Sequence, residues 1–217
     1  MKNIYLIIIL SLFLSSGCTW HAPKEKSAIE LTAIGMKAFE NKKYLKAINS
    51  FEKLRDWYPF SKYAILAELK IADSHFYLKE YDEAVLAYNE FEKLHPRNEV
   101  IPYIINQIGL CYVKQIDTID RDQTSAKRGA TEFKRLLRQF PESEYSLKAK
   151  EHIKKCRESL AGHDLYVGLF YFKTKHYKAA LYRFMGIVKE YPELEVSKEA
   201  LSYISLCESL IKEKEPE

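Results

Sequence analysis

The stretch Ala47-Ile-Asn-Ser-Phe-Glu-Lys-Leu-Arg-Asp-Trp-Tyr-Pro59 sets a small residue, an aromatic four positions later and a proline eight positions after that. The same spacing returns three times: Ala84–Tyr88–Pro96, Gly129–Phe133–Pro141 and Ala180–Phe184–Pro192. A small residue lets one helix lie close to its partner, and the aromatic fills the space beside it. Proline then ends the second helix, because it lacks an N–H group and its ring clashes with the preceding turn. One helix pair cannot bury its apolar face alone, so the pattern predicts stacked helical hairpins.

A second small residue precedes the aromatic by sixteen positions in three copies, namely Gly35, Ala72 and Gly168. In the third copy the corresponding residue is Gly109, and eight extra residues separate it from Phe133. They fall within 115–125, a charged segment that contains Asp117, Asp120, Arg121 and Asp122. Insertions in repeat proteins often belong to the binding face, and a solvated loop is the alternative. The segment lacks the glycine and the final glutamate of a calcium-binding EF-hand loop.

The segment between Pro141 and Pro192 is longer than the repeat period of about 34 residues. No glycine or proline interrupts residues 144–161, and apolar residues keep helical spacing across Gly162. We therefore predict one long helix over residues 143–174, which would be about 47 Å long. The last predicted helix, 195–212, has no second half and is a candidate cap for the exposed core.

The order of small, small, aromatic and proline positions resembles the tetratricopeptide (TPR) repeat. The predicted fold is an all-α, TPR-like α-solenoid of antiparallel helix pairs with about nine to ten helices. Its first helix follows Ser27, a candidate N-cap with Glu30 as its capping-box partner. The repeat domain spans 27–213, with units at about 28–60, 65–97, 102–142 and 143–192 and the terminal helix at 195–212.

Composition and charge favour a folded protein without a nucleic-acid partner. The chain is 47% hydrophobic and 29% charged, which is too apolar for disorder. A net charge of +4 is small for a nucleic-acid binder, which needs a concentrated basic footprint. Lysines and arginines do outnumber acids within 127–157. That run either faces acidic headgroups or an acidic partner, or is a solvated helix surface.

The N-terminus carries a secretion signal. Lys2 precedes a mostly apolar run over 4–14, which is too short to span a bilayer and matches the core of a signal peptide. Small residues then lead into Cys18, and this resembles the bacterial lipobox, in which the cysteine is lipidated and becomes the first mature residue. We expect a signal peptide over 1–17, a lipidated tether over 18–26 and an outer-membrane anchor through acyl chains such as palmitate on Cys18. The alternative is an ordinary signal peptide followed by a chance cysteine.

The sequence contains no recognisable catalytic or metal-binding motif. Its six histidines are scattered, and it contains no HExxH motif, glycine-rich phosphate loop or GxSxG nucleophile elbow. Cys111, Cys156 and Cys207 lack metal-ligand spacing and are expected to be small buried hydrophobes. We therefore expect no enzymatic activity, no cofactor and no metal site.

Several features together resemble the BamD family of TPR outer-membrane lipoproteins. They are the lipobox at Cys18, Trp57–Phe60 at the end of the first unit, Asp120–Asp122 in the third, and Ala179–Pro192 with Arg183. The resemblance covers nearly the whole mature chain and stops near the C-terminus, where the family commonly has another helix.

The resemblance implies a role in the machinery that assembles β-barrel proteins in the outer membrane. The C-terminal repeats would dock on a POTRA domain of the central barrel subunit through Arg183, whose guanidinium can pair bidentately with a carboxylate. Asp120, Arg121 and Asp122 are further candidate partner contacts, and companion lipoproteins are expected. Arg183 is an ordinary surface residue in the alternative interpretation.

The N-terminal repeats, by the same resemblance, receive the C-terminal segment of unfolded outer-membrane proteins. The first helix of each unit would line the groove, with Phe39, Leu69, Asp73 and Phe76 facing inward and Phe60 at the border. The other expected groove residues are Ile29, Thr32, Met36 and Leu66. The alternative is that these side chains belong to the core.

Two other functions fit the anchor and the repeats. One is a different TPR lipoprotein, such as a secretin pilot or a cell-wall coordination factor. The other is an accessory domain of an enzyme such as a muramidase, against which the missing catalytic constellation counts.

Overall fold

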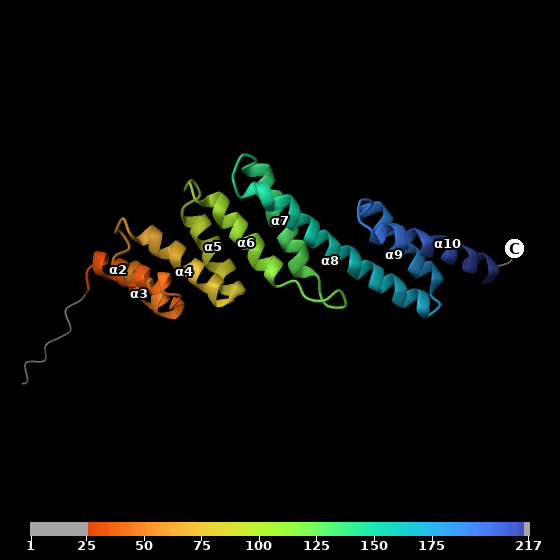
Figure 1. Cartoon of the computed structure of the whole chain (residues 1–217), viewed down its shortest axis with the longest axis horizontal. Coiled ribbons are helices and arrows are strands. Elements are labelled where there is room, and N and C mark those ends of the chain that lie inside the picture. Colours follow the sequence, from red (N-terminus) through yellow and green to blue (C-terminus); the bar gives the residue numbers. More distant parts are fainter. Residues whose placement is uncertain (1–25, 215–217) are drawn as a thin grey trace, which may run out of the picture.

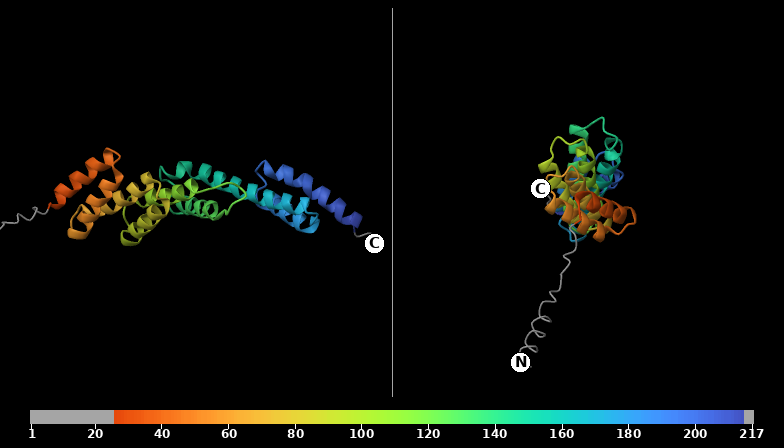
Figure 2. Two further views of the ribbon diagram at one scale, coloured as in Figure 1. Left: turned by 90° about the horizontal axis from the view of Figure 1, so that it is seen from below. Right: turned by 90° about the vertical axis from the view of Figure 1, so that its left-hand side faces the viewer.

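The computed structural model describes residues 26–214, and these form nine α-helices and no strand (Figure 1). The helices are α2 (Ala28–Glu40), α3 (Tyr44–Trp57), α4 (Ala64–Leu78), α5 (Tyr81–Leu94), α6 (Ile101–Lys114), α7 (Thr124–Gln139), α8 (Ser146–Lys173), α9 (Tyr177–Glu190) and α10 (Val196–Lys214). Each helix packs mainly against its neighbours in the chain, so the molecule is an extended, curved stack (Figure 2). The predicted all-α solenoid is confirmed. The signal peptide over 1–17 and Cys18 lie outside the described residues.

Local sequence explains where the helices begin and turn. Ser27 and Glu30 form the predicted capping box at the start of α2: the Ser27 hydroxyl accepts from the Glu30 N–H, and the Glu30 carboxylate accepts from the Ser27 N–H at 2.8 Å. The tight turns within three of the hairpins each place a lysine at positive φ, with values of 58° for Lys42, 64° for Lys79 and 61° for Lys175. The recurrence of this left-handed residue shows that these three hairpins use the same turn.

The aromatic of each repeat is wedged between helices, as predicted. Phe51, Tyr88, Phe133 and Phe184 have no exposed surface. A Cβ atom added to Gly168 would lie 2.6 Å from the Phe184 ring, and Gly35 and Phe51 have the same relation. Glycine is therefore required where the aromatic ring reaches the backbone of the first helix.

The long helix α8 joins two of the hydrophobic cores. It runs without a break through Gly162 and is slightly shorter than the predicted 143–174. Ala149 and Cys156 in its first half belong to the central core, which α4 to α7 also build. Ala161 belongs to the C-terminal core with α9 and α10. A separate core unites α2, α3 and α4 at the other end.

The three cysteines of the described range are buried and free, as expected. Burial raises the pKa of the Cys111 thiol to about 12 and that of Cys156 to about 11. Both thiols are therefore protonated at neutral pH and serve as core residues.

Candidate interaction site

Arg183 lies on the exposed side of α9 at the edge of a hollow. Its guanidinium Nη1 donates to the Asp164 carboxylate of α8 at 3.3 Å, and its side chain is 43% exposed. The same hollow is lined by Tyr182, Met185, Gly186, Lys189 and Glu190. Asp164 therefore fixes one edge of the guanidinium while other donors of Arg183 stay open to a partner.

The surroundings of Arg183 have the composition of a protein-binding surface. Tyr182 is 77% exposed and Met185 is 55% exposed. Aromatic residues, methionine and arginine are the side chains enriched in protein interfaces. Sequence reasoning found Arg183 but missed Asp164, Tyr182 and Met185. The spacing of Tyr182, Met185 and Lys189 on one helix face was the available signal.

A second arginine fixes the end of α9 next to this surface. Arg157 of α8 donates to the Glu193 carboxylate at 2.9 Å and to the Glu190 carbonyl at 2.7 Å, and its guanidinium lies 5.0 Å from the Tyr191 ring centre. The backbone N–H of Glu193 and then Arg157 lower the pKa of the Glu193 carboxyl, which keeps it ionised. Arg157 thereby holds the C-terminal end of α9 against α8.

The charged segment between α6 and α7 is fastened to α8. The buried Gln123 amide donates to the carbonyls of Thr118 and Arg121, both at 3.0 Å, and accepts from the Ser159 hydroxyl of α8 at 2.6 Å. His163 Nδ1 lies 2.6 Å from the carbonyl oxygen of Ile119. The backbone of this segment is therefore held by side chains that are distant in sequence.

Asp120, Arg121 and Asp122 stand exposed on this fastened segment. Hydrogen bonds from Thr118 lower the pKa of the Asp120 carboxyl, and those from Thr124 lower that of Asp122. Both carboxylates are therefore charged at neutral pH. Adjacent residues of α8 contact the two predicted partner sites, since His163 touches the segment and Asp164 binds Arg183.

The predicted groove residues of the first two units fall into different environments. Phe39 is half-buried, and its ring meets those of Tyr44 and Tyr77 edge-on, with ring centres 5.5 and 5.7 Å apart. The Lys70 ammonium lies 4.6 Å from the centre of the Phe39 ring. Phe60 is fully exposed at the turn after α3. The other members, Leu69 and Phe76, are partly buried against the central core. Phe39, Phe60 and the exposed Tyr77 thus offer aromatic surface to a partner.

The structure corrects the prediction for Asp73. Its side chain is buried, because Oδ1 accepts hydrogen bonds from the Tyr88 hydroxyl at 2.8 Å and the Tyr103 hydroxyl at 2.7 Å. Oδ2 pairs with the Lys70 ammonium at 2.8 Å. Asp73 therefore joins α4, α5 and α6 and is unavailable as a groove contact.

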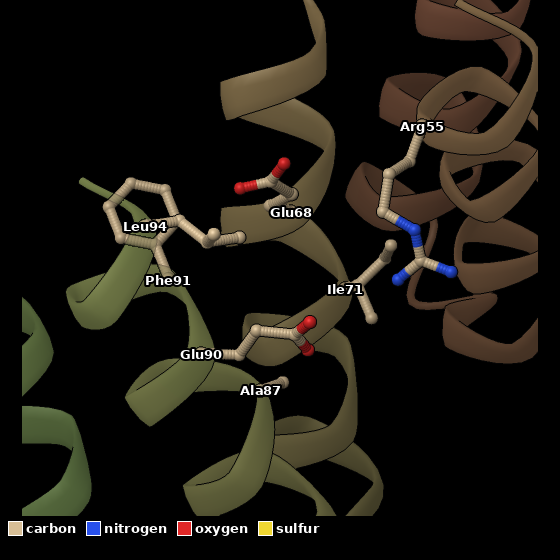
Figure 3. A pocket seen from close by; sticks show the side chains of 7 residues that line it. All are labelled: Arg55, Glu68, Ile71, Ala87, Glu90, Phe91 and Leu94. Carbon is tan, nitrogen blue, oxygen red and sulfur yellow. The ribbon is translucent and has the colours of Figure 1, made fainter. Parts of the chain in front are cut away.

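A separate hollow lies between the first two units, and none of the predicted groove residues lines it. Its walls come from α3, α4 and α5 (Figure 3). Arg55 stands on one side, with Glu68 and Glu90 on the other. Glu68 already pairs with His95 at 2.6 Å. The hollow is a gap between neighbouring units with charged groups at its rim.

Comparison with known proteins places the chain in a family. The family model for YfiO, described as an outer membrane lipoprotein, matches residues 24–215. The chain belongs to this family. Curated relatives carry the name outer membrane protein assembly factor BamD, so the resemblance seen in the sequence is confirmed.

Relatives of the family align over most of the chain. The Rickettsia prowazekii protein is 32% identical over 167 residues, which are 77% of this chain and 66% of that protein. The Caulobacter vibrioides protein is 24% identical over 86% of this chain and 63% of its own length. The chain thus spans slightly under two thirds of these two relatives. The Neisseria meningitidis serogroup B protein is 26% identical over 95% of this chain and 84% of its own length.

Solved structures support the fold. The TPR2AB domain of yeast Sti1, solved in a complex with pHSP90, has a TM-score of 0.52 and 17% identity and covers 87% of this chain and 78% of that one. Within residues 26–214 no helix is long and apolar enough to cross a bilayer, and no group of three or more histidine, cysteine or acidic side chains gathers in a metal-binding arrangement.

Proposed function

We propose that the protein is a non-enzymatic scaffold in the assembly of outer-membrane β-barrel proteins. It binds the POTRA-bearing central barrel subunit and companion lipoproteins, receives unfolded outer-membrane proteins, and uses neither a cofactor nor a nucleic acid. Family membership supports this assignment, because the curated relatives are named as outer membrane protein assembly factors. Acylated Cys18 would anchor the chain to the outer membrane, with the repeats facing the periplasm.

One observation supports the proposed contact with the partner. Arg183 is held at the rim of an open hollow by Asp164, and exposed Tyr182 and Met185 stand beside it. Tyrosine and arginine are enriched among the residues that contribute most to protein–protein binding, and methionine is enriched in interfaces. We assign this surface to the POTRA domain, with the segment 120–122 as a neighbouring contact and Phe39 and Phe60 as client contacts.

Replacing Arg183 by glutamate is expected to weaken binding to the central subunit. Charge reversal removes the guanidinium and sets a carboxylate against the acid it is proposed to meet. Because the side chain is 43% exposed, solvent screens part of the effect, and we expect about tenfold weaker binding. The measurement is recovery of a POTRA-bearing barrel protein with the affinity-purified chain from solubilised membranes.

Arg138→Glu is the matched control, since Arg138 is an exposed arginine on α7 and makes the same charge change. It should leave recovery and helicity unchanged. Equal recovery with Arg183→Glu and wild type would remove Arg183 from the interface. Recovery of a secretin or a cell-wall enzyme in place of the barrel protein would reject the proposed function.

Replacing Cys18 by serine is expected to release the protein from the membrane. Each acyl chain contributes about 0.8 kcal/mol per buried CH₂ group, and the described helices offer no membrane span in its place. Fractionation of cells that lack the central subunit separates lipid anchoring from retention by that partner. Membrane retention of Cys18→Ser in those cells would contradict the anchor.

A further inference from the structure

Helix α7 and the first half of α8, residues 146–157, carry a concentrated positive charge. Residues 127–157 contain ten lysines and arginines and four glutamates. This excess is larger than the net charge of +4 of the whole chain, so the rest of the chain is net acidic. The two helix segments pack side by side, and the Phe133 ring of α7 stacks on His152 of α8 with ring centres 4.7 Å apart. The positive charge therefore belongs to one region of the fold (Figure 1).

Many of these cations lie on the side of the two helices that points away from α6. Phe133 of α7 points toward Gly109 of α6, where an added Cβ atom would lie 2.8 Å from the ring. The exposed cations of α7 follow one another at spacings of seven and four residues and so share a different face. On α8, Lys148 lines a hollow next to α6, and the lysines at 150 and 154 lie on the other side of the helix. The basic surface thus consists of the exposed residues Lys127, Lys134, Arg138, Lys150 and Lys154.

The charges of the basic surface are largely uncompensated within the protein. The one acid in the sequence of α7, Glu132, pairs with Arg135 at 2.7 Å, and Arg135 does not belong to the basic surface. Lys154 lies 3.8 Å from Glu158, which is an exposed pair. Among residues 26–214, no ion pair is formed by Lys134, Arg138 or Lys150. An external anion would therefore meet these cations without displacing an internal carboxylate.

The side chains of the basic surface suit a lipid bilayer better than a protein. Lysine is depleted in protein interfaces, where aromatic residues, methionine and arginine are enriched. Neither α7 nor the segment 146–157 exposes a phenylalanine, tyrosine or tryptophan, in contrast to Tyr182 and Met185 beside Arg183. Clustered lysines are attracted by a layer of anionic headgroups, which requires no shape complementarity. Leu147, which is 81% exposed near Lys150, adds an apolar side chain of the kind that enters the headgroup layer.

We propose that the basic surface binds the anionic headgroups of the membrane to which the chain is anchored. The proposal rests on the proposed function, which attaches the chain to the outer membrane through Cys18. The first unit lies at one end of the extended stack and α7 lies near its middle, so both regions touch one bilayer when the stack lies along it (Figure 2). Such a contact is weak and is screened by salt. It therefore orients the stack and does not replace the acyl chains.

The test is co-sedimentation with lipid vesicles. The mature chain is produced without its signal peptide and with Cys18→Ser, so that no acyl chain contributes to binding. One set of vesicles is phosphatidylcholine alone, and in the second about a third of the lipid is phosphatidylglycerol. We expect binding to the anionic vesicles to be at least about tenfold stronger, and we expect this preference to disappear at about 0.5 M salt.

A double variant, Lys134→Gln with Lys150→Gln, removes one charge from each helix of the basic surface. It is expected to bind the anionic vesicles about tenfold more weakly than the parent chain. Lys93→Gln with Lys212→Gln is the matched control, because it removes the same charge from exposed lysines of α5 and α10 and should bind like the parent. All four lysines are exposed, so circular dichroism should show unchanged helicity in both variants.

Equal binding to the two kinds of vesicle would overturn the inference. A preference that survives the double variant, or that falls equally in the control, would overturn it too. So would an acidic protein that is recovered from solubilised membranes with the parent chain and lost with the double variant, in the absence of vesicle binding. That result would assign the basic surface to a protein partner.

The acyl anchor is tested apart from the basic surface. If the unacylated chain shows no preference for anionic vesicles and cell fractionation still releases Cys18→Ser, the inference falls and the anchor stands. A high-salt wash during that fractionation removes any contact through the basic surface. Retention of Cys18→Ser after the wash would therefore contradict the anchor alone.

Discussion

Replacing Asp73 by alanine is expected to lower the free energy of unfolding by at least about 2 kcal/mol, because two tyrosine hydroxyls lose their acceptor at about 1–3 kcal/mol each. Asp73 is 2% exposed, and its carboxylate holds three partners from three helices. Alanine would leave the buried Tyr88 hydroxyl without its acceptor at 2.8 Å and would leave Lys70 without its carboxylate at 2.8 Å. Urea unfolding followed by far-ultraviolet circular dichroism measures the loss.

The tyrosines cannot compensate by ionising. Burial, and then the charge of Asp73, raise the pKa of Tyr88 and of Tyr103 well above the ordinary value for a phenol. Both therefore remain hydroxyl donors at neutral pH. Among residues 26–214, the only other hydrogen bond to the Tyr88 hydroxyl comes from Gln107, which donates at 3.4 Å and therefore supplies no acceptor.

Two variants separate charge from hydrogen bonding at this position. Asp73→Asn keeps an acceptor oxygen for the tyrosines and should lose less stability than Asp73→Ala. Asp56→Ala is the matched control, because Asp56 is an exposed acid paired with Arg55 and should change stability by no more than about 0.5 kcal/mol. A loss for Asp73→Ala as small as that for Asp56→Ala would contradict the assigned role of the cluster.

Asp73 shows that a repeat pattern alone does not predict which side chains are buried. Its position within the second unit predicts a groove residue, because the repeat places that position on the inner side of the first helix. The structure buries it because the Tyr88 hydroxyl of its own unit and the Tyr103 hydroxyl of the next unit both donate to the same carboxylate. The repeat pattern gives the spacing of small, aromatic and proline positions, and it does not show which polar side chains meet in the core.

The helices themselves were predictable because the local sequence determines where they begin and end. The second helix of the unit predicted at about 28–60 ends at Trp57, just before Pro59, as the proline predicts. The long helix was predicted because no breaker interrupts it and its apolar spacing continues through Gly162. Local periodicity and breakers determine such features, and a single sequence displays both.

The candidate site was predictable only one residue at a time. Arg183 was found by resemblance, but its partner Asp164 lies nineteen residues earlier on another helix. Gln123, which holds the charged segment, is fixed by Ser159 thirty-six residues away. Both pairs form because α8 runs beside α7 and α9, and no spacing in the sequence marks them.

Truncating Phe184 to alanine is expected to lower the free energy of unfolding by about 3–5 kcal/mol. The ring is fully buried in the C-terminal core and stacks on Tyr203 with centres 5.1 Å apart. Its removal would open a cavity between α8, α9 and α10. Tyr182→Ala is the matched control: it removes an aromatic ring from the same helix, but this ring is 77% exposed, so little stability should be lost. The measurement is urea unfolding, as for Asp73.

The close contact between the Phe184 ring and the backbone at Gly168 allows a more specific test of the role of the ring. A methyl group on Gly168 would lie 2.6 Å from the Phe184 ring, so Gly168→Ala should destabilise wild type by about 1–3 kcal/mol. In the Phe184→Ala background the same methyl group enters the new cavity and should be neutral or stabilising. At Gly186, where a Cβ meets nothing within 4 Å, alanine should stabilise by up to about 1 kcal/mol through helix propensity. Destabilisation by Gly168→Ala that is equal in both backgrounds would mean that the aromatic ring is not what requires a glycine at this position.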